Sequence, residues 1–153
     1  MKKQQKKKPL AENRRARYDY EILDTYEAGL VLHGYEVKSI KTGRVSLRGA
    51  YVVIKNNEAY LINTLIPPYQ PANTPDDYNP ERSRKLLLNK SEIKSLIGKS
   101  KQKGLTLVPL KLYTKRGKIK LGLAVAKGKR KIDKREAIKK RETEREVQRE
   151  LGG

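Results

Sequence analysis

Three arginines and a tyrosine near the start of the chain carry side-chain types that bind nucleic acids. The segment at residues 13–18 reads NRRARY, and its arginines are Arg14, Arg15 and Arg17. A guanidinium fork matches the oxygen atoms of a phosphate, and an aromatic ring can stack on an unpaired base. Core packing is the alternative role for Tyr18, and also for Tyr20 and Tyr26 further along, and the residues alone leave both roles open.

The residue types that commonly perform catalysis are almost missing. His33 is the only histidine and Cys is absent, so neither a histidine or thiolate metal cluster nor a catalytic triad with a second histidine can form. His33 precedes Gly34 at the end of an expected strand, which favours a surface or helix-capping role. No Walker-type phosphate loop occurs, and the acidic pair at residues 76–77 lies in a proline-rich loop where solvent accommodates it. We therefore expect a protein that is not an enzyme and that needs no metal or cofactor.

Residues 128–153 form a highly charged C-terminal tail. Between positions 127 and 150 the chain has eleven Lys or Arg and six Asp or Glu. So polar a segment cannot bury enough apolar surface to offset its loss of conformational entropy. Asp133 and Glu136 form a helix-capping pair, but a lone helix of this length is marginal in water. We expect a tail that is disordered alone and becomes helical on a polyanionic partner.

The net charge indicates the same class of partner. The chain has 153 residues and a formal net charge of +20, and 36% of its residues are hydrophobic. So basic a protein is drawn to nucleic acid or to an anionic membrane. The membrane is the weaker alternative, because no apolar run approaches the roughly 20 residues of a spanning helix. The basic N-terminus lacks the apolar segment of a secretory signal, and the lack of Cys fits a cytoplasmic protein.

Apolar residues gather in the middle of the chain, where their spacing predicts strands and short helices. Tyr18, Tyr20 and Ile22 alternate with polar residues as in a half-buried strand. Residues 34–42 have helical spacing, and Gly43 is placed to end that helix. The expected hairpin strands are residues 51–54 with 59–66, and 105–113 with 118–126.

Turn and cap signals support these elements. Asn56 and Asn57 can adopt the positive φ of a tight hairpin turn. Pro109 removes one ladder hydrogen bond and indicates an edge strand or a bulge. Asn89 and Glu92 form a capping pair ahead of the apolar stripe of a second helix.

The order of the elements favours a mainly β fold with short helices, an OB-like antiparallel β-barrel. Strand counting does not decide between a closed barrel and an open sheet. We expect a basic disordered arm at residues 1–12, an OB-like RNA-binding barrel at 13–127 and the charged tail at 128–153. The three leucines at 86–88 stand at the entrance of the second helix. Core packing is their leading role, but because all three cannot point inward, one is a candidate for a ligand surface.

Five separated segments of this chain resemble the SsrA-binding proteins, also called small protein B. These are the bacterial partners of transfer-messenger RNA in the rescue of stalled ribosomes. In chain order the matching segments read NRRARYDYEI, YEAGLVLHGYEVKSI, GRVSLRGAYV, YNPERSRKLLLN and GLAVAKGKRKIDKREAIKKRE. The resemblance implies an OB-like barrel that binds the tRNA-like domain of transfer-messenger RNA and delivers it to stalled ribosomes.

The resemblance also indicates an RNA-binding surface, which corresponds here to Asn13, Glu27, Leu87 and Asn89. Asn and Glu can hydrogen-bond base edges or 2′-hydroxyl groups, and Leu can pack on a splayed base. The alternatives are a helix cap for Asn89 and a Lys or Arg partner for Glu27. With the neighbouring basic residues, the candidate RNA contacts are Asn13, Arg14, Arg15, Arg17, Glu27, Arg84, Lys85, Leu87 and Asn89.

In the family, the tail enters the vacant mRNA path and the decoding region of the small ribosomal subunit, where it forms a helix. The residues implied here are Lys127, Lys129, Arg130, Ile132, Asp133, Lys134 and Arg135. Many members have His or an aromatic residue at the position of Ile132. Ile can cover a base face by apolar contact, but it has no π-system with which to stack.

Two other functions are consistent with parts of the sequence. A generic OB-fold RNA-binding or ribosomal protein would explain the charge and the barrel, but not the five motifs. It would bind any structured RNA with similar affinity. A basic enzyme acting on RNA would need an acid–base or metal-binding set of residues that the sequence does not offer.

Overall fold

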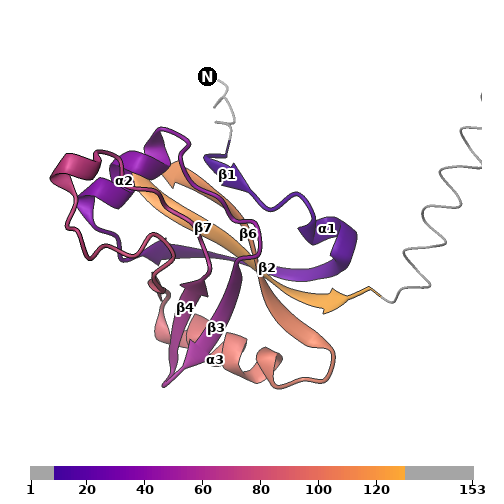
Figure 1. The fold of residues 1–153 in the computed structure, drawn as a ribbon. Coiled ribbons are helices and arrows are strands. Elements are labelled where there is room, and N and C mark those ends of the chain that lie inside the picture. Colours follow the sequence, from indigo (N-terminus) through magenta and orange to yellow (C-terminus); the bar gives the residue numbers. More distant parts are fainter. Residues whose placement is uncertain (1–8, 130–153) are drawn as a thin grey trace, which may run out of the picture.

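Alternating apolar side chains and tight turns produce the strands of one curled antiparallel sheet (Figure 1). The structure, a computed structural model, describes residues 9–129. Its strands are β1 (Ala11–Glu12), β2 (Tyr20–Leu30), β3 (Tyr51–Lys55), β4 (Glu58–Ile62), β5 (Arg84–Leu87), β6 (Leu105–Lys115) and β7 (Lys118–Gly128). Its helices are α1 (Ala16–Asp19), α2 (Gly34–Lys41) and α3 (Lys90–Ser100), with a 3-10 turn η1 (Pro71–Asn73).

The strand order is β1-β6-β7-β2-β5-β4-β3, and every neighbouring pair is antiparallel. The sheet curls until β3 approaches β6, but no strand pairing joins these two strands within residues 9–129. The architecture is therefore the predicted OB-like, mainly β fold. The question of closure is also answered for the described residues, because the hydrogen-bonded ladder stays open at this seam.

The hairpin turn at Asn56 and Asn57 has the predicted backbone, and the turn at Arg116 and Gly117 also has two positive φ angles. Asn56 and Asn57 have φ of 53° and 59°, and Arg116 and Gly117 have φ of 52° and 77°. Two consecutive positive φ angles match the twist of the flanking strands and join them directly. The register of β6 shifts between Pro109 and Lys111, so the predicted irregularity at the proline is a β-bulge.

The main core lies inside the curled sheet. Its fully buried side chains include Leu61, Leu96, Leu112, Leu121 and Leu123. A second, smaller cluster lies on the outer face of the sheet beneath α1, where Ala16 packs with Val108 and Ala126. All six residues of β7 from 121 to 126 are buried. Leu121, Leu123 and Val125 belong to the main core and Ala126 to the second cluster.

Three elements differ from the sequence-based expectation. Residues 16–19 form α1, so Tyr18 belongs to a helix turn and the strand begins at Tyr20. Ala11 and Glu12 pair with β6 as β1, so residues expected in the disordered arm belong to the sheet. Residues 84–87 form strand β5, which the sequence did not predict, and the leucines at 86–88 lead from this strand into α3. Within residues 9–129, no helix combines the length and the apolar character needed to cross a bilayer.

Candidate nucleic-acid interface

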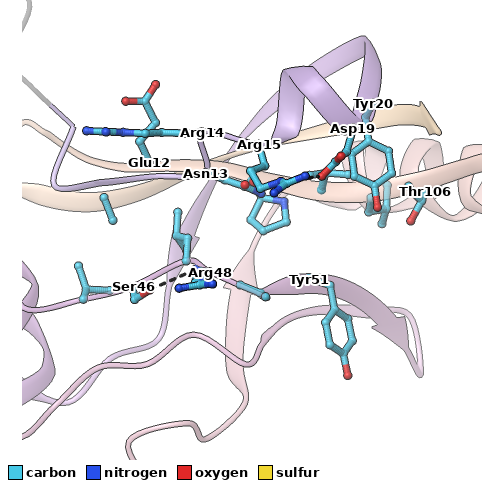
Figure 2. A pocket seen from close by; sticks show the side chains of 18 residues that line it. Glu12, Asn13, Arg14, Arg15, Asp19, Tyr20, Ser46, Arg48, Tyr51 and Thr106 are labelled. Atoms are coloured by element: carbon cyan, nitrogen blue, oxygen red, sulfur yellow. Dashed lines mark hydrogen bonds and ion pairs between the residues drawn. The ribbon is translucent and has the colours of Figure 1, made fainter. Parts of the chain in front are cut away.

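A groove of about 680 Å³ opens at the seam of the sheet (Figure 2). Asn13, Arg14 and Arg15 line one side, while Arg48 and Tyr51 line the other. The structure therefore brings together the three predicted RNA-contacting residues on one side. Across the groove it adds Arg48, which lies in the loop before β3. We call this feature the seam groove. Its guanidinium groups and open shape suit a phosphodiester strand.

Asn13 is held in one orientation beside the seam groove. Its backbone N–H donates to the carbonyl of Leu110 at 2.7 Å, and its Nδ2 donates to the carbonyl of Pro109 at 2.9 Å. The bulge at Pro109 interrupts the ladder here, which frees strand carbonyls for such bonds. Asn13 thus has a structural task in fixing the N-terminal segment, in addition to the RNA contact that the resemblance implies.

The arginines that follow lie at the protein surface. Arg14, Arg15 and Arg17 are exposed. Arg15 lies with its Nε 3.5 Å from Asp19, and its guanidinium is 5.5 Å from the centre of the Tyr18 ring. Because the Arg15 side chain is 77% exposed, this ion pair adds little stability and a phosphate can replace it.

The start of the tail lies against helix α1, which contains Arg17 and Asp19. The N–H of Lys129 donates to the carbonyl of Asp19 at 3.0 Å, and its Nζ donates to the carbonyl of Arg17 at 2.9 Å. Lys127 is exposed at the end of β7. The other predicted tail contacts, Arg130, Ile132, Asp133, Lys134 and Arg135, lie outside the described residues.

Glu27 and Leu87 lie on a different surface, the outer face of β2 and β5. Leu87 is 52% exposed and pairs with Gly29 of β2. Glu27 lies two residues earlier on β2, so its side chain points to the same face. Neither Glu27 nor Leu87 lines the seam groove. The predicted RNA contacts are therefore divided between two surfaces, and we call the second the Glu27–Leu87 face.

Two residues near this face have partners within the protein, and for Asn89 the partner is the helix cap that the sequence-based alternative proposed. The N–H of Glu92 donates to Oδ1 of Asn89 at 2.9 Å, and Glu92 accepts from the N–H of Asn89 at 3.2 Å. The predicted capping of α3 is confirmed, and this use of Oδ1 leaves the amide NH2 group of Asn89 as a donor for RNA. Lys85 lies 2.9 Å from Glu58, in an exposed ion pair.

Glu27 also has the cationic partner that was its alternative. The hydroxyl of Tyr113 donates to its Oε2 at 2.5 Å, and Nζ of Lys115 lies 3.2 Å from its Oε1. The hydrogen bond from Tyr113, opposed by partial burial and assisted by Lys115, lowers the pKa of Glu27. Glu27 is therefore ionised at neutral pH and already bound to two side chains of β6.

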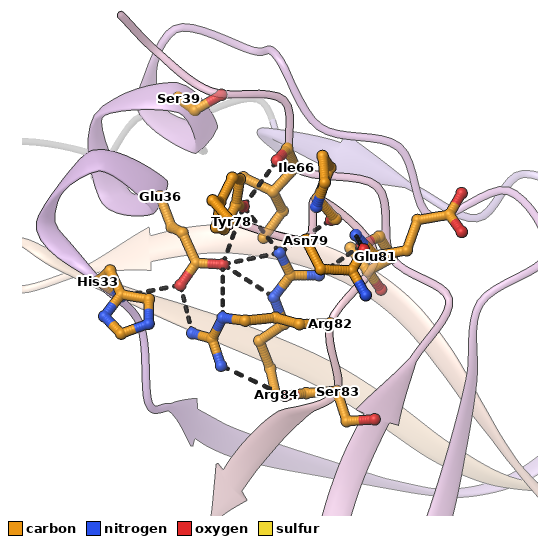
Figure 3. Close-up of polar contacts among 12 residues, drawn as sticks. His33, Glu36, Ser39, Ile66, Tyr78, Asn79, Glu81, Arg82, Ser83 and Arg84 are labelled. Atoms are coloured by element: carbon orange, nitrogen blue, oxygen red, sulfur yellow. Dashed lines mark hydrogen bonds and ion pairs between the residues drawn. The ribbon is translucent and has the colours of Figure 1, made fainter. Parts of the chain in front are cut away.

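Arg84 does not belong to any RNA-binding surface, and that prediction is wrong. Its side chain is fully buried, and its guanidinium donates to Glu36 Oε2 at 2.9 and 2.7 Å (Figure 3). It also donates to the carbonyls of Thr64 and Pro80, at 2.5 and 2.9 Å. The hydroxyl of Tyr78 lies 3.0 Å from the same guanidinium. With its donors engaged and its atoms out of solvent, Arg84 cannot contact RNA in this fold.

Glu36 is the centre of this buried cluster. It accepts hydrogen bonds from Arg82, Arg84 and the N–H of His33. Burial would raise the pKa of Glu36, but the hydrogen bonds from Arg82, His33 and Arg84 outweigh burial and lower it below its ordinary 4.5. Burial, with the charge of Glu36, raises the pKa of Tyr78 to about 12. The cluster is thus a carboxylate between two guanidinium groups, and it joins α2 to β5 and the loop between β4 and β5.

Sequence reasoning missed several basic and aromatic residues at these surfaces. Arg48 reaches the seam groove from a loop, where no periodic pattern marks it. Lys111 and Tyr113 could have been found, because alternate residues of the predicted strand at 105–113 share one face. No group of three or more His, Asp or Glu within residues 9–129 is arranged to hold a metal ion.

Comparison with known proteins connects these surfaces to one family. The model of the family described as "SmpB protein" matches residues 10–153. The chain belongs to the SmpB family. An SsrA-binding protein from Trichodesmium erythraeum is 54% identical over 144 residues, which is 94% of this chain and 92% of the relative. The SsrA-binding protein of Coprothermobacter proteolyticus is also 54% identical, over 94% of this chain and 96% of the relative.

A solved SmpB-family structure has the same fold. It comes from the work described as "tmRNA-SmpB: a journey to the center of the bacterial ribosome" and is 50% identical, with a TM-score of 0.65. The match covers 83% of this chain and 92% of that chain. The family resemblance of the five sequence segments is therefore confirmed.

Proposed function

We propose that this chain is a non-enzymatic RNA-binding protein of trans-translation that acts in the cytoplasm. It binds the tRNA-like domain of transfer-messenger RNA and delivers it to stalled ribosomes. The observation that carries the proposal is the match of residues 10–153 to the SmpB family, together with a 50% identical solved chain from work titled for tmRNA–SmpB and the bacterial ribosome.

The arrangement of the described surfaces supports this function. The seam groove presents Arg14 and Arg15 for phosphates, and the Glu27–Leu87 face presents an exposed leucine for a splayed base. Asn89 can add a donor beside Leu87. A folded RNA such as a tRNA-like domain offers both backbone and unpaired bases, which suits a protein with two different surfaces.

The charged tail supplies the second half of the proposal. The segment that contains Asp133, Lys134 and Arg135 enters the vacant mRNA channel and contacts small-subunit ribosomal RNA in the decoding region. Its support is the family's tail motif and the excess of Lys and Arg between residues 127 and 150. Lys129, at the start of the tail, lies beside Arg17 in the basic N-terminal segment.

The proposed division of labour can be tested with tail variants in a reconstituted reaction on stalled ribosomes. Replacing residues 133–135 with alanines should leave the affinity for the tRNA-like domain nearly unchanged and abolish tagging of the stalled peptide. The control replaces residues 148–150 in the same tail. Equal loss of RNA affinity and tagging in the 133–135 variant would contradict the assignment of separate roles to barrel and tail.

A further inference from the structure

A group of lysines and one tyrosine extends the Glu27–Leu87 face across β7 and β6. Residues paired across neighbouring strands share a face, and Glu27 pairs with Gly122, which pairs with Lys111. In the next row, Gly29 pairs with Lys120, which pairs with Tyr113. Lys111, Tyr113 and Lys120 therefore point to the same side of the sheet as Glu27.

A chain of contacts connects Glu27 to Lys111 through Tyr113. Glu27 accepts the hydrogen bond from the Tyr113 hydroxyl, and Nζ of Lys111 lies 5.3 Å from the centre of the Tyr113 ring. Glu27 and Tyr113 are two strands apart, a span of roughly 10 Å. Gly122 lies between them and has no side chain, so the two side chains can meet above it. A Cβ at Gly122 would lie 3.5 Å from the Tyr113 ring and 3.5 Å from Lys111 Cγ.

Lys120 joins this group to Leu87. Its Nζ lies 3.7 Å from the position that a Cβ on Gly29 would occupy, and Leu87 Cβ lies 3.3 Å from that position. Lys120 and the exposed Leu87 therefore lie beside each other over a glycine. The lysines of β6 and β7 continue the proposed RNA-binding surface without interruption.

The ammonium groups of Lys111 and Lys120 are available to bind an anionic partner. Neither is within ion-pair distance of a carboxylate among residues 9–129, whereas Lys115 and Lys85 are. The carboxylate on this face, Glu27, has Tyr113 and Lys115 as its partners. A surface with two ammonium groups that form no salt bridge, beside an exposed leucine, is complementary to a sugar–phosphate backbone.

We propose that Lys111 and Lys120 bind phosphates of the RNA backbone, and that Glu27 and Tyr113 are positioning residues that hold Lys111 in place. This inference rests on the proposed function, since its partner is the RNA that the Glu27–Leu87 face binds. Glu27 itself needs no contact with the RNA. Its carboxylate orients the Tyr113 ring, and the ring holds the Lys111 ammonium by a cation–π contact.

The phosphate contacts can be measured through the salt dependence of binding. The full chain is titrated with the tRNA-like domain of transfer-messenger RNA over about 50–200 mM salt, where the slope counts phosphate contacts. Lys111→Gln and Lys120→Gln should each reduce the slope by about one. Lys41→Gln, at an exposed lysine that ends α2, is the matched control and should leave the slope unchanged. Slopes for the first two variants that equal the control would overturn the proposal.

The positioning roles can be measured with a double-mutant cycle. Glu27→Ala and Tyr113→Phe should each weaken RNA binding about five-fold, the factor that corresponds to one net hydrogen bond of about 1 kcal/mol. The double variant should bind no more weakly than either single variant, because both act through the same contact. Additive losses would mean that Glu27 acts on the RNA independently of Tyr113.

A spectroscopic readout separates positioning from general damage to the fold. Burial, with the hydrogen bond and charge of Glu27, raises the pKa of Tyr113. An absorbance titration of Glu27→Ala should therefore show one tyrosine, identified by its loss in Tyr113→Phe, that ionises at lower pH than in the wild type. An unchanged titration would show that the two groups do not interact in solution and would contradict the positioning role.

The same experiments distinguish failure of this inference from failure of the proposed function. If the wild-type chain does not prefer the tRNA-like domain over ordinary tRNA, the proposed function fails and this inference fails with it. If the wild type shows the preference while the variants at Lys111 and Lys120 bind like the control, only this inference fails.

Discussion

Glu36→Gln should severely destabilise the protein, because it removes the charge at the centre of the buried cluster. Glu36 and Arg84 are both fully buried, and Arg82 adds a second guanidinium whose side chain is 27% exposed. Removing one partner of a buried ion pair leaves an uncompensated charge and typically costs about 3–5 kcal/mol. Since a domain of this size is stable by only about 5–15 kcal/mol, much of the free energy of unfolding would be lost.

The measurement is urea unfolding of the wild type and the variant, followed by far-ultraviolet circular dichroism. The midpoint should fall while the slope of free energy against urea stays similar. Glu58→Gln is the matched control, because Glu58 forms an exposed pair with Lys85, and it should leave the midpoint unchanged. A Glu36→Gln midpoint equal to that of the control would refute the reasoning.

The cluster also predicts a dependence of stability on pH. The folded-state pKa of Glu36 is lowered from its ordinary 4.5, so its contribution is fully present above pH 4.5 and is lost as the pH falls through the lowered value. Glu36→Gln should therefore lose less stability than the wild type on acidification. An identical acid dependence in both proteins would contradict the lowered pKa.

Three further predictions concern local structure. Asn89→Ala should lower the free energy of unfolding by about 1 kcal/mol, measured by urea unfolding, because the α3 cap is lost. Asn89→Asp keeps the cap and should therefore have the stability of the wild type, but RNA titration should show weaker binding. Leu86→Ala should cost about 2–5 kcal/mol because Leu86 is buried, whereas Leu87→Ala should leave the urea midpoint unchanged and weaken RNA binding. Gly117→Ala should lower the free energy of unfolding by about 1–2 kcal/mol, because Gly117 has positive φ. Gly98→Ala should raise it by about 0.5–1 kcal/mol, because Gly98 lies on α3 with open space around it and alanine favours a helix over glycine.

Sequence reasoning predicted most of the β-hairpins and helices because their signals are local. Asn56 and Asn57 specify a turn by their tolerance of positive φ, and Asn89 specifies a helix start by its side-chain oxygen. Pro109 correctly indicated a break in the ladder. Each of these residues acts on its own neighbours in the chain, so no knowledge of the tertiary structure was needed.

The missed elements depend on contacts between distant residues. Strand β5 begins with Arg84 at an inward position, and an inward arginine does not fit a hydrophobic alternation. It is stable there only because Glu36, 48 residues earlier, meets it in the core. Strand β1 has two residues, and its pairing with β6 determines its structure.

The predicted binding residues also divide into those that a local signal marks and those that depend on contacts between distant residues. Because three successive leucines cannot all be buried, the sequence indicated that one of residues 86–88 is exposed, and the family resemblance implied that it is Leu87. The prediction for Arg84 failed because exposure of a charged residue is a good general rule that a buried counter-charge overrides. The separation of Asn13 from Glu27 onto two surfaces follows from the curl of the sheet, which no local pattern contains.

Binding of the purified chain to the tRNA-like domain of transfer-messenger RNA, in competition with ordinary tRNA, tests the proposed function most directly. We would measure it at ~150 mM salt, where exposed charges farther apart than about 8 Å are screened. A strong preference for the tRNA-like domain is the predicted result. Equal competition by tRNA would contradict the proposed function and indicate a basic OB-like protein that binds RNA without this preference.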